Sequence, residues 1–421
     1  YEAYIVGGYV RDYLLGIPSN DVDICTNAPI DKIMKIFKGR GKAFKEYYAY
    51  HIDDGEFSYE ITTFRKEGKY KKNKPVDISI AKDLGTDLLR RDFTINTFAI
   101  DNAGHLVDIL GAKKDLDSRL IRVVGDTEKK LTEDKTRIIR AIRFACTLDF
   151  DLDPEILNFI SNKKAYLLNE VPAEYKKREL DKIFESNNID KFFYLINRFN
   201  MGKYFNISYT GNIVQTYDKY GVWAQLQTDL PFSNKEKSII VGIKKIVDDK
   251  DISLNEVKKY DKEIVYNAAS ILGLDEKVKA LQAGVNLSVN IISDVIEEYS
   301  IFYELHNNAE SSNTTIVLDN SNAPGSARLE VLIGNSESDC IPYEGALFTN
   351  IVELRPGDYC GQVYRIHESV LSSLKGGEVL FVQLNIIVDK KVICNCSRSL
   401  LFTVDAPAKS LARKMTSDIL K

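Results

Sequence analysis

Short runs of apolar residues, separated by polar turns, open the chain. The pattern predicts strands at residues 3–6 and 21–24 and a helix at residues 30–38. Two turn signals, Asp-Asp-Gly at residues 53–55 and Asn-Ala-Gly at residues 102–104, each lie between apolar runs and predict hairpins. We therefore expect a small mixed sheet backed by helices.

Between residue 113 and about residue 306, the apolar positions recur with helical spacing. No internal repeat is visible in this stretch, so the pattern predicts an irregular, all-helical body. The predicted helices cover residues 137–148, 154–168, 173–186, 191–199, 235–247, 262–272 and 285–306.

A third pattern begins after a polar stretch at residues 309–313, which we interpret as a linker. Short β-rich runs separated by Gly, Pro, Asn and Asp favour a separate all-β, sandwich-like or jelly-roll-like module. Residues 311–405 contain 11 acidic and 7 basic residues, so this module is poorly suited to binding a polyanion. Its predicted strands are residues 315–318, 329–333, 379–388, 391–396 and 400–404.

The charge balance limits how the protein can bind nucleic acid. The chain has 421 residues, enough for two or more domains, and a formal net charge of −4. Nucleic acid would therefore contact local basic patches, of which residues 65–74, 137–143 and 176–182 are the clearest. Each patch also fits a solvated helix face or a mobile loop.

Cysteine and histidine are too sparse and scattered to suggest a metal centre. The six cysteines include no C-x-x-C pair and there are four histidines, so we expect neither a zinc site nor a disulfide framework, and a reducing cytoplasm. We expect Cys146, His51 and His105 to be structural. No apolar run approaches the ~18 residues of a membrane span. Tyr1 opens almost directly into a strand, so we expect the natural chain to begin upstream.

The most informative motif joins a glycine pair to a pair of carboxylates. Gly7 and Gly8 close the first strand and Arg11 begins the next helix, so main-chain N–H groups there can face phosphate oxygens. Asp21 and Asp23 are two apart on a strand and project from one face, which suits Mg²⁺ chemistry on a triphosphate. Alone, the glycines would indicate a turn and the aspartates a solvated edge.

This segment resembles the head-domain signature of class II tRNA nucleotidyltransferases, the CCA-adding enzymes, and of the closely related bacterial poly(A) polymerases. The resemblance implies an α+β fold with a polymerase-β-like nucleotidyltransferase head. It also implies that Gly7, Gly8 and Arg11 hold the incoming triphosphate, and that Asp21 and Asp23 hold two Mg²⁺ ions.

A second block, from Arg90 to Asn96, is similar to the RRDFTINA motif of the family, whose last alanine is Thr97 here. The resemblance implies that Arg91 contacts the nucleotide and that Asp92 and Asn96 order the surrounding loop or the sugar. Without the neighbouring motifs, this block would fit an ordinary helix start with a surface ion pair.

A third block, Glu133-Asp134-Lys135-Thr136-Arg137, matches the EDxxR motif of the family. At a spacing of three, Asp134 and Arg137 would share one helix face. A carboxylate beside a guanidinium complements the amine and ring nitrogen of cytosine and adenine, so the pair would accept CTP and ATP and reject GTP and UTP. A simple surface ion pair is the alternative. The resemblance implies that Arg140 and Arg143 steady the triphosphate or the Asp134–Arg137 pair.

Three further features stay open. Glu60 is a third carboxylate that could lie near the metals, or a half-exposed hairpin charge. Residues 66–75 form a Gly- and Lys-rich loop, for which we expect mobility that would suit a lid. Residues 173–182 resemble the last head-and-neck motif of the family, but Tyr175 replaces its usual arginine.

We therefore expect four regions: a catalytic head at residues 1–112, neck helices for base selection at 113–186, an RNA-binding helical body and tail at 187–310, and a β-rich module of unknown role with a short C-terminal tail at 311–421. The expected reaction is attack by the 3′-hydroxyl of tRNA on CTP or ATP, which adds CCA. The sequence leaves open a poly(A) polymerase, a CC-only or A-only enzyme, and a binding or structural protein, such as a phage component, with a nucleotidyltransferase-like domain.

Overall fold

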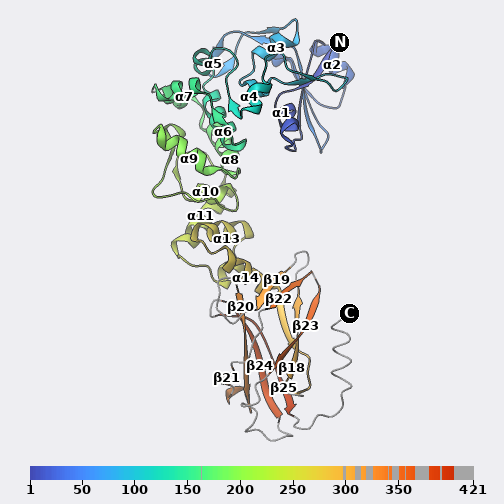
Figure 1. The fold of residues 1–421 in the computed structure, drawn as a ribbon, viewed down its shortest axis with the longest axis vertical. Coiled ribbons are helices and arrows are strands. Elements are labelled where there is room, and N and C mark those ends of the chain that lie inside the picture. Colours follow the sequence, from blue (N-terminus) through green and yellow to red (C-terminus); the bar gives the residue numbers. More distant parts are fainter. Residues whose placement is uncertain are drawn as a thin grey trace. The chain divides into compact units, whose positions relative to one another are not determined.

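The computed structural model describes residues 1–162, 164–296, 300–308, 314–318, 326–339, 341–343, 350–355, 357–365, 379–388 and 391–402. The chain forms two compact units. Unit 1 comprises Tyr1–Gln215 and Gln225–Ser233, and unit 2 comprises Thr216–Ala224 and Asn234–Lys421. Figure 1 shows the elements of both units.

A seven-stranded mixed sheet forms the start of unit 1, as the alternation of apolar and polar residues predicts. Its strand order is β11-β10-β1-β2-β5-β4-β3, and all neighbours are antiparallel except β2 and β5. Both expected hairpins, β4–β5 and β10–β11, are present. The strands are β1 (Ala3–Val6), β2 (Asp21–Thr26), β3 (Lys42–Phe44), β4 (Ala49–Asp53), β5 (Ser58–Thr63), β10 (Ala99–Ile100) and β11 (Leu106–Val107).

Apolar side chains cover both faces of this sheet. Helix α2 (Ile30–Ile36) packs Ile30 and Ile33 against Tyr50 and Ile61 in one cluster. A second cluster contains Val6, Cys25 and Ala99 of the sheet with Leu84 and Leu88 of helix α3 (Leu84–Leu89). The sheet is therefore held between α2 on one face and α3 on the other.

Residues 65–80 form a paired extension, which corrects the expectation of an unstructured loop at residues 66–75. Strand β6 (Arg65–Glu67) pairs with β9 (Ile78–Ile80), and β7 (Tyr70–Lys71) pairs with β8 (Lys74–Pro75). Lys72 and Asn73 make the turn in the left-handed region, with φ of 50° and 62°. Main-chain pairing and this turn therefore give residues 65–80 a regular structure, although their Gly- and Lys-rich composition predicts an irregular loop.

Helices follow the sheet in unit 1, in agreement with the helical spacing. The segment expected to be one helix at residues 154–168 is divided into α7 and the 3₁₀ helix η3 (Lys164–Glu170). The α-helices are α1 (Gly8–Leu15), α4 (Lys113–Asp117), α5 (Thr127–Glu133), α6 (Thr136–Thr147), α7 (Pro154–Ser161), α8 (Ala173–Phe184) and α9 (Ile189–Arg198).

Asp134 separates two of these helices. It ends α5 with an extended backbone (φ −131°, ψ 98°), and its Oδ1 accepts hydrogen bonds from the N–H and hydroxyl groups of Thr136 at the start of α6. Asp134 is thus the C-cap of α5, and its carboxylate binds the first residue of α6 although Asp134 is not part of that helix. The expectation that Asp134 and Arg137 share one helix face is therefore wrong.

Unit 2 begins with helices α10 (Lys219–Ala224), α11 (Asn234–Asp248), α12 (Leu254–Lys259), α13 (Lys262–Leu272) and α14 (Asp275–Asn286). Asn267 on α13 is fully buried, accepts a hydrogen bond from the Asp218 N–H group and donates one to the Asp218 carboxylate. These bonds satisfy the buried amide and fix the segment that precedes α10.

The predicted helix at residues 285–306 is wrong, because strands begin directly after α14. They are β16 (Leu287–Ile291), β17 (Val295–Ile296) and β18 (Ser300–Asn307). Leu287, Val289 and Ile291 are buried while Ser288 and Asn290 between them are less so, which is the period of a strand. β16 pairs with β18, so the two segments satisfy each other's main-chain groups.

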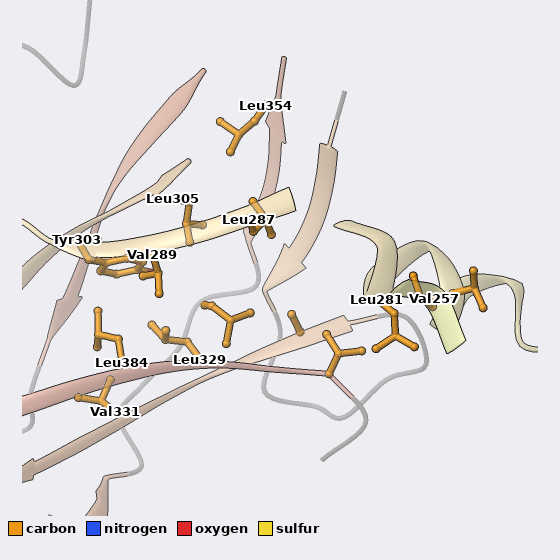
Figure 2. Packing of buried hydrophobic residues seen from close by; sticks show 14 of the residues in the cluster. Val257, Leu281, Leu287, Val289, Tyr303, Leu305, Leu329, Val331, Leu354 and Leu384 are labelled. Carbon is orange, nitrogen blue, oxygen red and sulfur yellow. The ribbon is translucent and has the colours of Figure 1, made fainter. Parts of the chain in front are cut away.

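Two sheets form the rest of unit 2, as expected for a β-sandwich. One has the order β16-β18-β23, and the other has β17-β25-β24-β20-β19-β22 with β21 on β20. Figure 2 shows Val289, Tyr303 and Leu305 of the first sheet opposite Leu329 and Leu384 of the second. The remaining strands are β19 (Thr314–Leu318), β20 (Ser326–Gly334), β21 (Ile341–Tyr343), β22 (Asn350–Leu354), β23 (Tyr359–Arg365), β24 (Val379–Val388) and β25 (Lys391–Phe402).

The four expected strands between residues 315 and 396 are present, and the expected strand at 400–404 continues β25 as far as Phe402. The predicted linker at 309–313, residues 403–404 and the C-terminal tail lie outside the described residues. Within the described part of the chain, none of the helices combines the length and apolar character that crossing a bilayer requires.

Candidate functional site

Three carboxylates lie on the neighbouring strands β2 and β5 in the middle of the head sheet. Asp21 and Asp23 project from the same face of β2, and Glu60 on the parallel strand β5 is in register with Asp23. Asp21 and Glu60 are exposed, whereas Asp23 is partly buried. Burial raises the pKa of Asp23, and the neighbouring charges of Glu60 and Asp21 raise it further, while the Arg91 guanidinium opposes the shift.

These oxygen donors suit a divalent metal ion. A hard cation such as Mg²⁺ binds through one or two carboxylates together with substrate phosphates and water. Among the described residues, no three His, Cys, Asp or Glu side chains are grouped closely enough to hold a metal by themselves. Asp21 and Asp23 thus fit a metal whose coordination is completed by a bound substrate.

Gly7 is required where the strand β1 meets helix α1. Its φ is +81°, and a Cβ there would lie 2.7 Å from Oδ2 of Asp23 and 2.9 Å from Nη1 of Arg91. Any side chain would therefore collide with both groups. The missing side chain lets a carboxylate and a guanidinium approach the same small space.

Arg11, Asn96 and Asp92 form a hydrogen-bonded chain. Nη1 of Arg11 donates to Oδ1 of Asn96 at 2.6 Å, and the Asn96 amide donates to Oδ1 of Asp92 at 3.0 Å. The Nε and Nη2 groups of Arg11 bind Asp12 at 2.8 and 2.7 Å. Arg11 is 7% exposed and Asn96 is 6% exposed, so these contacts are shielded from water.

Arg140 completes this chain. Its Nε and Nη2 both donate to Oδ2 of Asp92, at 2.8 and 2.5 Å. Burial raises the pKa of Asp92, but Arg140, Asn96 and the Phe93 N–H group together hold the pKa well below its ordinary value. Residues from α1, the Arg90–Asn96 block and α6, far apart in sequence, thus meet in one network.

Phe144 gathers three of the basic side chains. The guanidinium carbons of Arg143, Arg11 and Arg140 lie 3.9, 4.8 and 5.6 Å from the centre of its ring. Cation–π attraction holds like charges close together here. Arg143 also binds Glu179 of α8 at 2.6 Å. The Phe144 ring itself is buried.

Arg90 and Arg91 lie just after α3 and are both directed to acidic partners. Nε of Arg90 is 3.0 Å from Oδ1 of Asp87, and its Nη1 is 3.3 Å from Glu67. Nη2 of Arg91 is 3.6 Å from Oδ2 of Asp87. Sequence reasoning missed Asp87, although its positions three and four before the two arginines are those of helical ion pairs.

Asp134 and Arg137 meet across the helix break. Oδ2 of Asp134 is 3.8 Å from Nε of Arg137. Arg137 is 4% exposed and donates from Nη1 to the Lys130 carbonyl at 2.8 Å and from Nη2 to the Tyr70 hydroxyl at 2.9 Å. The Tyr70 hydroxyl in turn donates to Glu67 at 2.5 Å, so the β7 strand contacts the start of α6.

Tyr175, at the position of the usual arginine of the family, lies beside another cation. The guanidinium carbon of Arg178 is 4.6 Å from the Tyr175 ring centre. Arg178 is exposed and α8 supplies both residues, so a positive group remains near this position although residue 175 has none.

The predicted residues therefore form three groups within unit 1. Asp21, Asp23 and Glu60 lie together on the adjacent strands β2 and β5, and Arg91, beside Gly7, lies next to Asp23. Arg11, Asp92, Asn96, Arg140 and Arg143 form the second group around Phe144. Asp134 and Arg137 form the third group, together with Tyr70.

Comparison with known proteins finds a family match that covers the first group and the part of the second group that precedes α6. Residues 3–122 match the family model described as the poly A polymerase head domain. The N-terminal part of the chain is therefore similar to this head domain. All of Gly7, Arg11, Asp21, Asp23, Glu60, Arg91, Asp92 and Asn96 lie within this head.

Curated relatives are similar over a longer stretch of the chain. A CCA-adding enzyme of Bacillus pumilus is 38% identical over 192 residues, which are 45% of this chain and 48% of the relative. One of Streptococcus pneumoniae is 34% identical over 239 residues, 56% of this chain and 58% of the relative. The chain thus spans about half the length of the curated relatives it matches.

Among solved structures, this chain is similar to the Bacillus stearothermophilus CCA-adding enzyme in complex with CTP. The sequence identity is 27% and the TM-score is 0.54, over 66% of this chain and 73% of the other. The α+β head followed by helices is the shared fold.

Proposed function

We propose that this protein is a template-independent tRNA nucleotidyltransferase that adds nucleotides from CTP and ATP to the tRNA 3′ end. The observation that carries the proposal is the convergence of the glycine-carboxylate motif, the Arg90–Asn96 block and helix α6 in linked clusters of unit 1. The names of the relatives, CCA-adding enzymes, support the same assignment.

We assign the divalent metal implied by the family to Mg²⁺, held by Asp21 and Asp23. Asp21 is exposed and Asp23 is half-buried, so carboxylate oxygens on β2 would be accessible to a metal ion. When bound there, Mg²⁺ would lower the pKa of the attacking hydroxyl and neutralise charge on the triphosphate. Glu60 on β5, in register with Asp23, is a third carboxylate that would add negative charge beside the metal.

The side chains of the chain itself would bind and orient the nucleotide. Gly7 and Gly8 leave the main chain accessible where α1 begins, and Arg11 supplies a fixed positive charge. Arg140 and Arg143 add two more positive charges around Phe144 for the triphosphate. Asp92 holds Arg140, Asn96 holds Arg11, and the two residues order the loop that would face the sugar.

Asp134 and Arg137 would select the base. The Asp134 Oδ2 atom, which is 3.8 Å from Arg137, can accept from the exocyclic amine of cytosine or adenine, and Arg137 can donate to the ring nitrogen. Guanine and uracil present a carbonyl in place of the amine and would leave the charged groups unpaired. Arg137 has five N–H groups, and it donates two of them to the Lys130 carbonyl and the Tyr70 hydroxyl, which leaves donors for a base.

We propose the following division of labour: catalysis by residues 1–112, base selection by residues 113–186, and tRNA binding by the helices within residues 187–310. The β-rich residues 311–421 have no assigned part in the reaction. We place the protein in the cytoplasm, where tRNA is processed.

Poly(A) synthesis is the second candidate, because the matched family model is that of a poly A polymerase head. CC-only and A-only activities use the same head groups. A binding or structural role would require a head that no longer reacts, whereas both carboxylates of β2 and the Asp134–Arg137 pair are retained.

The proposal is tested with the full chain, tRNA lacking its 3′ CCA, and each nucleoside triphosphate alone and in combination. We expect two cytidines and one adenosine to be added, with no incorporation from GTP or UTP. Long oligo(A) tails from ATP alone would identify a poly(A) polymerase, and incorporation that stops after CC or requires CC would identify the single-nucleotide enzymes. No incorporation from any nucleotide would refute the proposal.

A further inference from the structure

Asp87 on α3 is fully buried, 0% exposed, and lies outside every motif recognised in the sequence. Its Oδ1 accepts hydrogen bonds from the Arg65 N–H group and from Nε of Arg90, both at 3.0 Å. Its Oδ2 lies 3.4 Å from Nη2 of Arg90 and 3.6 Å from Nη2 of Arg91. One buried carboxylate therefore contacts two guanidinium groups and the main-chain N–H group of Arg65.

Arg91 has two carboxylates nearby, Asp87 and Asp23. Its Nη1 lies 2.9 Å from the point where Gly7 would carry a Cβ, and Oδ2 of Asp23 lies 2.7 Å from the same point. Within the described part of the chain, an ion pair joins Arg91 to Asp87 and none joins it to Asp23. Nε of Arg91 is buried without a hydrogen-bond partner, so this guanidinium is incompletely satisfied where it lies.

An incompletely bonded guanidinium beside a carboxylate has a strong tendency to form a bidentate ion pair. In this protein, such a pair with Asp23 would occupy the oxygens that a divalent cation requires. Asp87 supplies the competing negative charge at Nη2 of Arg91, at a site where burial makes charge interactions strong.

We propose that Asp87 is a positioning residue of the metal site: by retaining Arg91, it prevents that guanidinium from closing onto Asp23 and keeps the Asp23 carboxylate available to a divalent cation. Arg91 then acts as a fixed positive charge behind the site rather than as a ligand of Asp23. This inference rests on the proposed function only for its catalytic consequence, since metal binding can be measured without RNA or nucleotide.

The test is Mn²⁺ binding to the full chain, measured from the electron paramagnetic resonance signal of the free ion. In Asp87→Asn, Arg91 loses its charged partner and pairs with Asp23, so we expect Mn²⁺ affinity to fall about tenfold. The matched control is Asp83→Asn at the N-cap of the same helix, because Asp83 is exposed and its side chain accepts hydrogen bonds from Thr86. Asp83→Asn should bind Mn²⁺ as the unmodified protein does.

A second variant separates positioning from a general loss of structure. Arg91→Gln removes the competitor while Asp87 keeps Arg90 and the Arg65 N–H group, so it should fold and bind Mn²⁺ at least as tightly as the unmodified protein. Adding Arg91→Gln to Asp87→Asn should restore the affinity that Asp87→Asn loses. A merely structural role of Asp87 would lower the melting temperature of both Asp87 variants without such restoration.

The proposal is overturned if folded Asp87→Asn binds Mn²⁺ within twofold of the unmodified protein, or if Arg91→Gln alone binds it more weakly. If Asp87→Asn does not fold, the Arg91→Gln result still decides. A parallel assay of nucleotide addition should show that Asp87→Asn needs more Mg²⁺ for half-maximal rate. Failure of the unmodified chain to add nucleotides would refute the proposed function and leave the Mn²⁺ result intact.

Discussion

Arg140 directs two hydrogen bonds to a single oxygen of Asp92, at 2.8 and 2.5 Å. The other oxygen of Asp92 is taken by Asn96 and the Phe93 N–H group. Both oxygens of the Asp92 carboxylate therefore accept hydrogen bonds from other groups of the protein. These bonds tie the loop after α3 to the middle of α6. The head and the first long neck helix are joined through this carboxylate.

Acid should weaken this link in a specific pH range. Because the pKa of Asp92 is lower in the folded protein than its ordinary value near 4, its contribution to stability is complete above about pH 4 and is lost as the pH falls through the folded pKa. Asp92→Asn cannot make this contribution. We expect the free energies of unfolding of the two proteins to differ at pH 7 and to converge as the pH is lowered below 4.

Denaturant unfolding followed by circular dichroism at several pH values would measure this difference. Asp31, an exposed aspartate in the first turn of α2, provides a control as Asp31→Asn. A gap between the proteins that stays constant from pH 7 to pH 2.5 would contradict the assignment of the Asp92–Arg140 link.

Replacing both carboxylates of β2 should abolish catalysis and spare the fold. Asp21→Ala/Asp23→Ala removes the metal ligands and, with them, an uncompensated buried charge, so the melting temperature should not fall. We expect nucleotide incorporation to drop by at least 10³-fold. Asp31→Ala, an exposed aspartate in the first turn of α2, is the control and should retain full activity. Persisting activity in the double variant would rule out the proposed metal ligands.

Gly7 offers a test of close packing at the site. In Gly7→Ala, the new methyl group would collide with Asp23 and Arg91, and the residue would retain a left-handed φ. Gly16 has a similar φ of +70° with no atom within 4 Å of its Cβ position, so Gly16→Ala carries only the backbone cost of about 1 kcal/mol.

We therefore expect both alanine variants to lose stability, but only Gly7→Ala to lose more than about 100-fold in kcat/KM. Thermal melts and steady-state kinetics on the same preparations would separate the two effects. Equal kinetic losses in the two variants would show that the contact with Asp23 and Arg91 is unimportant.

Base choice can be tested without disturbing helix α6. Asp134→Asn retains an oxygen that can accept from Thr136 and so preserves the cap, but it places an amide where the carboxylate faces Arg137. We expect discrimination of CTP and ATP against UTP and GTP to fall by about tenfold, or about 1.4 kcal/mol. Asp126→Asn, the equivalent change at the N-cap of α5, should leave discrimination unchanged. Unaltered selectivity in Asp134→Asn would contradict the base-pairing role.

The sequence carried enough information for the parts of the site that depend on local periodicity. Asp21 and Asp23 lie on one face of β2 because side chains alternate along a strand, and the apolar positions of α6 are buried as their spacing predicts. Asp87 could not be recognised as functional, because its role depends on Arg91 and Asp23 meeting beside Gly7 in the folded chain.

Two of the structural errors have local causes. The run after Asn286 contains Leu287, Val289 and Ile291 at a spacing that fits a strand, but the preceding helical residues extend the helical pattern across it. Asp134 was placed inside a helix because its spacing to Arg137 is helical, whereas its carboxylate is used to cap α6. In both cases tertiary pairing or capping decided between two locally acceptable structures.

The strands directly after α14 change what can be removed from this protein. Helices α11 to α14 and both sheets contribute to one continuous cluster, in which Ile243, Val265, Leu305 and Leu384 are fully buried. Figure 2 shows Val257 and Leu281 of the helices together with Leu305 and Leu384 of the sheets. A chain cut after residue 310 would keep β16 and β18 but lose β23, the partner of β18, and β24, and it would expose this cluster to water. We expect such a fragment to aggregate, and sedimentation would show it. The β-rich module is thus not a detachable appendage: in calorimetry, it and the helices before it should melt together as one cooperative body.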